Sequence, residues 1–171
     1  MELYKFGVKI FVANPGTVDI RNVIPVFHNW IQEQKIEGHL LIDVHDYSHV
    51  QNGPGILLVA HEGNFSLDQA EGRLELVYYR KQPVADGLGS SFQAAQAAAR
   101  LLEEEPTLNE IRFRNDEFLV FGNDRLLAPN TAESRREFEL ALKRAFDGAT
   151  VSLAPRATDP RERLAFIVKP G

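Results

Sequence analysis

Residues 39–61 read HLLIDVHDYSHVQNGPGILLVAH, and this stretch decides the fold class. It contains two short and almost continuously apolar runs, 39–44 and 55–61, which are typical of central strands buried on both faces. The polar segment between them, 46–54, is too short for the crossover that a parallel pair needs. The sequence therefore predicts two neighbouring antiparallel strands, separated by a loop that ends at Gly53-Pro54-Gly55.

Patterns on either side of this stretch predict the remaining elements. Alternation of apolar residues predicts a first strand at 6–12, and helical spacing predicts a helix that includes Ile20 to Ile31. Pro25 either kinks that helix or marks the start of its main part after a short preliminary turn. Further along, we expect a polar loop or wide hairpin at 62–72, a strand at 73–80, and an alanine-rich helix that follows the segment 87–91, is capped at Ser90 and stops at Pro106. We also expect a hairpin at 111–121 turning at Asn115-Asp116, a third helix from Asn130 to Gly148, and strands at 151–153 and 164–168.

The predicted order is β-α-β-β-β-α-β-β-α-β-β. It favours an α+β fold in which three helices cover one face of a mainly antiparallel sheet, and it is compatible with two ferredoxin-like halves. No linker or low-complexity segment interrupts the chain. We therefore expect a single compact domain over residues 1–171, with 82–89 as the place where a subdivision would fall.

Composition narrows the classes of function. The chain has 171 residues, of which 44% are hydrophobic, and its length suffices for one core without a metal or disulfide. The absence of cysteine excludes thiolate catalysis and iron–sulfur ligation. A net charge of −5 with scattered basic residues argues against nucleic-acid binding. Without a signal peptide, a membrane span or cysteines, we expect a soluble, cytoplasmic protein.

Polar groups gather at the ends of the two central strands. Asp43 and His45 share one face of the first strand, because side chains alternate along a strand. An antiparallel pair would place His61 far from His45, which counts against one compact site. The candidate ligand-binding residues are Asp43, His45, Asp46, His49, His61, Glu62 and Asp68.

Three interpretations of this cluster remain open. In the first, the acids cap backbone groups of a tight loop and the histidines donate to carbonyl groups. In the second, His45, His49 and Asp43 hold a divalent metal, which would be the only cofactor implied. In the third, a histidine beside a carboxylate acts as a general base.

Three other features are weaker candidates. The segment 87–91, GLGSS, precedes a helix and could offer backbone N–H groups to an anion, although it matches no phosphate-binding motif. Arg125, after Asn123-Asp124, fits a structural ion pair or a substrate clamp. Phe11, an apolar residue on the more polar face of its strand, is a candidate contact between copies of the chain.

No recognised catalytic motif is present, so whether the protein is an enzyme stays open. The sequence favours a non-catalytic domain that binds a small ligand or associates with itself as a homo-oligomer. The alternative is a small metal-dependent hydrolase or isomerase that uses the cluster at 43–49.

Overall fold

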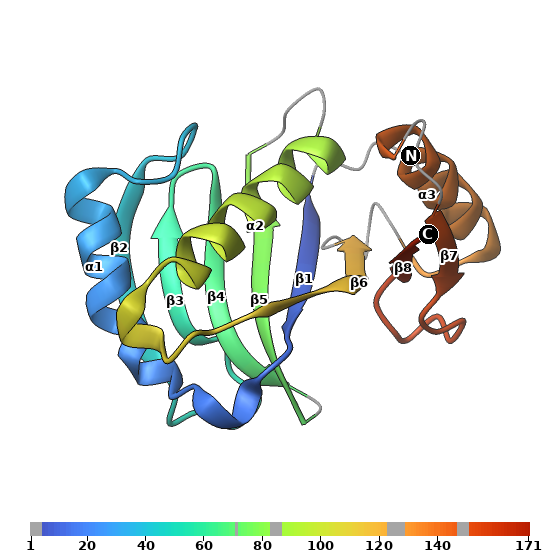
Figure 1. The fold of residues 1–171 in the computed structure, drawn as a ribbon. Helices are drawn as coiled ribbons and strands as arrows, with labels where there is room; N and C mark the ends of the chain where they lie inside the picture. Colours follow the sequence, from blue (N-terminus) through green and yellow to red (C-terminus); the bar gives the residue numbers. More distant parts are fainter. Residues whose placement is uncertain (1–4, 71, 83–86, 123–128, 147–150) are drawn as a thin grey trace.

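The computed structural model of the protein describes residues 5–70, 72–82, 87–122, 129–146 and 151–171. Eight strands in these ranges form one antiparallel sheet in the order β2-β3-β4-β5-β1-β6-β8-β7. Three described α-helices pack against it (Figure 1). The predicted α+β class, with a mainly antiparallel sheet and three helices, is confirmed.

The central strand β1 pairs with β5 on one side and with β6 on the other. It therefore joins strands β2 to β5 and strands β6 to β8 into one continuous sheet. The strands are β1 (Phe6–Val12), β2 (Leu41–Tyr47), β3 (Gly55–Ala60), β4 (Gly63–Ala70), β5 (Arg73–Arg80), β6 (Phe113–Gly122), β7 (Val151–Pro155) and β8 (Ala165–Pro170).

The helices are α1 (Val23–Glu33), α2 (Gly87–Glu103) and α3 (Ala132–Ala145), with short 3-10 helices η1 (Pro15–Thr17), η2 (Ile20–Asn22) and η3 (Pro106–Leu108). The main part of the first helix begins at Val23, directly before Ile24 and Pro25, after two preliminary turns. This agrees with the second of the two predicted readings of Pro25. Thr131 caps α3 by accepting a hydrogen bond from the backbone N–H of Ser134.

One face of the sheet carries the main hydrophobic core. Alternate residues of β1, such as Val8 and Ile10, point to the same side as Leu76 and Tyr78 of β5. The apolar stripe of α1 and the alanines of α2 cover this side, and α2 lies across β1 and β5 (Figure 1). Because alanine side chains are short, α2 approaches the strands closely. The opposite side, which we call the open face, carries no described helix.

The strand expected at 39–44 to be central and buried on both faces is instead β2, a mostly exposed strand at the edge of the sheet. Two further local predictions were wrong. The segment expected to be a polar loop or wide hairpin contains β4, in which Phe65 and Leu67 face the core while Ser66 between them faces the other side. The expected hairpin at 111–121 is instead one long strand, β6, and Asn115-Asp116 is an exposed part of it. In both cases the polar residues lie along a strand rather than in a turn.

The edge strand β2 is closed by side chains of the same chain. Gln34, in the left-handed conformation just after α1, accepts from the Leu41 N–H and donates to the Leu41 carbonyl, both at 3.0 Å. The Asp43 carboxylate accepts from the Val44 N–H at 2.8 Å. These contacts occupy backbone groups that an exposed edge would otherwise offer to another strand.

Candidate functional site

The open face of the sheet buries a second, smaller set of apolar side chains. Phe11, Leu119 and Phe121 belong to it, and each is at most 8% exposed although no described helix covers them. Arginine side chains shield the two rings: the Arg73 guanidinium lies 4.5 Å from the centre of the Phe11 ring, and Arg163 lies 4.7 Å from that of Phe121. The open face is thus apolar beneath and cationic above.

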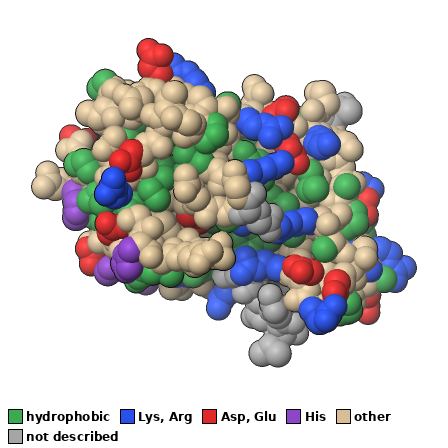
Figure 2. Space-filling view, turned by 90° about the horizontal axis from the view of Figure 1, so that it is seen from below, with side chains coloured by type: hydrophobic (Ala, Val, Ile, Leu, Met, Phe, Trp, Pro, Cys, Tyr) green, Lys and Arg blue, Asp and Glu red, His purple; other side chains and the backbone are tan. Residues whose placement is uncertain are grey.

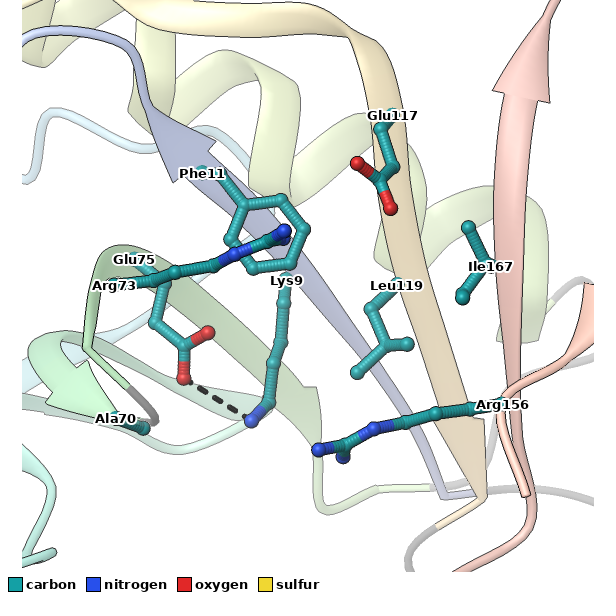
Figure 3. A pocket seen from close by; sticks show the side chains of 9 residues that line it. All are labelled: Lys9, Phe11, Ala70, Arg73, Glu75, Glu117, Leu119, Arg156 and Ile167. Atoms are coloured by element: carbon teal, nitrogen blue, oxygen red, sulfur yellow. Dashed lines mark hydrogen bonds and ion pairs between the residues drawn. The ribbon is translucent and has the colours of Figure 1, made fainter.

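A cleft of about 220 Å³ opens in this face, and we call it the open-face cleft (Figure 3). Phe11, Leu119 and Ile167 supply its apolar lining, from β1, β6 and β8. Its charged lining consists of Lys9, Arg73, Glu75, Glu117 and Arg156. A second hollow of about 190 Å³ adjoins it, because both are lined by Lys9, Leu119 and Arg156.

Lys9 and Glu75 form an ion pair at the base of the cleft. The Lys9 Nζ atom lies 3.0 Å from Glu75 Oε1, and the Glu75 side chain is only 4% exposed. Burying such a pair removes water from two charges, and this loss offsets most of their attraction. The ion pair therefore adds little to the free energy of unfolding, and its position is not explained by stability alone.

Asp68 extends this charged group onto β4. It lies directly opposite Glu75 in the β4–β5 pairing and is 9% exposed. Burial, and then the negative charge of Glu75, raise the pKa of Asp68 to about 7. Its Oδ1 atom has no hydrogen-bond partner within the ranges that the structure describes. Two carboxyl groups and one lysine thus share a buried position beside the cleft.

Positive side chains and histidines occupy different parts of the surface in the view of Figure 2. Figure 2 shows Lys and Arg side chains gathered across the middle of one side of the molecule, with hydrophobic side chains visible between them. The histidines of that view lie at the end where α1 and β2 are found. Cationic and histidine-rich regions are therefore separate.

The residues predicted from the sequence lie mainly at that other end. Asp43 and His45 are neighbours on β2, with 3.5 Å between Asp43 Oδ2 and His45 Nε2, and both side chains are about half exposed. The Asp46 carboxylate accepts from the backbone N–H and the hydroxyl of Ser48, and these hydrogen bonds lower the pKa of Asp46. Asp43 and Asp46 therefore each accept a hydrogen bond from a backbone N–H group, that of Val44 and that of Ser48.

His49 lines two wide, open hollows between η2 and the β2–β3 loop, of about 540 and 310 Å³. Asp19 and Arg21, an ion pair at 3.2 Å, line the larger one. No group of three or more His, Asp or Glu side chains among the described residues is arranged to hold a metal ion. The metal site at His45, His49 and Asp43 thus gains no support from this geometry.

His61 and Glu62 follow β3, at the opposite end of the β2–β3 pair from His49. His45 pairs with Leu57, four residues before His61, and the antiparallel pairing predicted from the loop length is confirmed. Glu62 accepts from the Leu40 N–H at 2.7 Å, which joins the two strands there. The structure consequently does not bring the three histidines together.

Of the predicted candidates, only Asp68 adjoins the charged group at the cleft. Lys9, Arg73 and Glu75 were missed, and their signal is a charged residue at alternate positions within strands that are otherwise apolar. Phe11 lies within the cleft beneath Arg73, and its contact with another copy of the chain stays a prediction.

The remaining candidates have simpler positions. The segment 87–91 lies within α2 rather than before it, and the buried Ser91 hydroxyl donates to the Gly87 carbonyl at 2.6 Å. The triplet Asn123-Asp124-Arg125 lies outside the described residues. His39, not singled out from the sequence, contacts the buried Tyr78 hydroxyl at 2.7 Å, and burial lowers the pKa of His39.

Comparison of the sequence with protein-family models finds no family that matches, and comparison with curated proteins finds no similar protein. None of the helices in the described ranges is long and apolar enough to span a membrane.

Proposed function

We propose that the protein binds a small molecule in the open-face cleft. The observation that carries this proposal is the buried Lys9–Glu75 pair at the base of a hollow in the sheet face that no described helix covers. Ionisable groups that are desolvated beside a cleft and held by a specific charge partner are concentrated at functional sites.

The shape and chemistry of the cleft also support ligand binding. Small-molecule sites are concave, largely apolar, and carry a few fixed polar groups that orient the ligand. Phe11, Leu119 and Ile167 provide the apolar part, and Arg73 and Lys9 provide polar groups held by a ring contact or an ion pair. Because these groups lie on paired strands, their positions are largely fixed before a ligand arrives.

A thermal-shift screen against a panel of small metabolites tests this proposal. A ligand present at about 100 times its Kd raises the free energy of unfolding by about 2.7 kcal/mol, which corresponds to about 5–10 °C in Tm. We expect at least one class of compound to raise Tm, and Ile167→Trp to abolish the rise. Ile167 is half-buried and lines the cleft, so a larger ring there fills the space.

Leu140→Trp is the matched control, because Leu140 is 53% exposed on α3. This variant should respond to the ligand as the unchanged protein does. A panel with no stabilising compound would contradict the proposal, and so would a Tm rise that persists in Ile167→Trp.

A further inference from the structure

We infer that the ligand of the open-face cleft carries an anionic group, a carboxylate or a phosphate, on a small apolar body. This inference rests on the proposed function and specifies the class of compound. It follows from the balance of charges in the cleft, from the way Arg73 is held, and from the apolar lining.

The carboxylates that line the cleft are already paired. Glu75 is bound by Lys9 at 3.0 Å, and Glu117 lies 3.3 Å from the Arg114 guanidinium on the same strand. Arg73 and Arg156 add two further positive charges to the lining. The lining thus holds three cations and two carboxylates, and this net positive charge favours a negatively charged guest.

Arg73 is held in a manner suited to anion recognition. Its guanidinium reaches from β5 over the Phe11 ring, as Figure 3 shows, with 4.5 Å from the central carbon to the ring centre. A guanidinium that stacks on a ring keeps its planar set of N–H donors, which match the oxygens of carboxylate and phosphate. Arg156 points into the cleft from the opposite side, toward Lys9 (Figure 3). An anion between the two would meet cations on both sides.

The apolar lining implies that the anion has a body to bury. Phe11 and Leu119 are at most 8% exposed, and Ile167 beside them is half-buried. A volume of about 220 Å³ suits a body of the size of one ring. A free inorganic anion would leave this surface in contact with water, whereas a ring would cover it.

Four probes with the same ring separate the possible classes: phenyl phosphate, benzoate, the neutral benzamide and the cationic benzylamine. Isothermal titration at low salt measures the Kd of each, and inorganic phosphate tests the ring requirement. We expect phenyl phosphate or benzoate to bind at least tenfold more tightly than benzamide, benzylamine and inorganic phosphate. Whichever of the two anions binds more tightly identifies the preferred head group.

Arg73→Gln should weaken binding of the preferred anion about tenfold, since it removes one charge-assisted hydrogen-bond partner. It should leave binding of benzamide nearly unchanged. Arg136→Gln is the matched control, because Arg136 is exposed on α3, and it should change neither affinity.

The outcomes distinguish this inference from the proposed function. If benzamide or benzylamine binds as tightly as the anions, and Ile167→Trp abolishes that binding, then the cleft binds small molecules but does not select anions. The inference would also be overturned if Arg73→Gln bound the preferred anion as tightly as the unchanged protein does. Failure of both aromatic anions to bind up to millimolar concentration would overturn it as well. A failure of the wider metabolite screen would overturn the proposed function itself.

Discussion

Asp68 is a largely buried acid whose Oδ1 atom has no hydrogen-bond partner within the described ranges. It is enclosed between Gly55 on β3 and Glu75 on β5. Gly55 has a φ of +64°, and a Cβ atom at this position would come within 3.0 Å of both the backbone and the Cβ atom of Asp68. A glycine is therefore needed for this acid to lie where it does, which links the Gly53-Pro54-Gly55 turn to the charged group on the open face.

Folding stability should depend on the protonation of Asp68. Its folded-state pKa of about 7 lies above the ordinary value of 3.8 for an aspartate, so between these two pH values the folded protein holds a proton that the unfolded chain releases. The resulting stability is complete below about pH 4 and is lost as pH rises through about 7. Between pH 5.5 and 8.5, this group should lower the free energy of unfolding by about 2 kcal/mol.

Asp68→Asn tests this dependence, because the amide resembles the protonated acid and does not ionise. Urea denaturation at both pH values should show a smaller loss of stability in the variant, which should also be the more stable protein at pH 8.5. Asp116→Asn is the control, since Asp116 is exposed and its pKa is lowered by Arg114. Parallel pH profiles for Asp68→Asn and the unchanged protein would refute this role for Asp68.

Among the secondary-structure elements, β2 shows how an edge strand is protected. The Gln34 side chain acts as a short substitute for a neighbouring strand, since it both donates to and accepts from Leu41. Leu40 and Ile42 on either side are 57% and 54% exposed, so this edge is apolar as well as accessible. Self-association through β2 would require Gln34 and Asp43 to give up these contacts, and a homo-oligomer stays a prediction.

Gln34→Ala should therefore expose the Leu41 backbone. We expect amide hydrogen exchange at Leu41 to accelerate about tenfold, and the free energy of unfolding to fall by about 1 kcal/mol, because two hydrogen bonds to partly buried groups are lost. Gln51→Ala, in the exposed β2–β3 loop, should change neither quantity. Unaltered exchange at Leu41 in Gln34→Ala would mean that the side chain does not protect the edge.

The same elements show what the sequence could and could not predict. Periodicity identified the strands with strong apolar patterns and the antiparallel turn between β2 and β3. It missed β4 because Asn64, Ser66 and Asp68 resemble loop residues when their opposite face is unknown. It misread β6 because Asn115-Asp116 is a common turn pair, whereas here it extends an exposed part of a strand.

The whole molecule is a sheet with helices on one side and a charged cleft on the other (Figures 1 and 3). The cleft depends on the strand order, which places Lys9, Glu75 and Leu119 on adjacent strands although they are distant in the sequence. Register between such strands is set by the pairing of the complete sheet, and local patterns do not reveal it. The histidine cluster, by contrast, was visible in the sequence because its members are close along the chain.

The most direct test of the account is to map where the ligand binds, by following backbone amide resonances during titration with the tightest of the aromatic anions. We expect the largest shifts at residues 9–11, 73–77 and 117–119, which surround the open-face cleft. Shifts confined to residues 46–53, around His49, would contradict the account and would place the binding site at the β2–β3 loop instead.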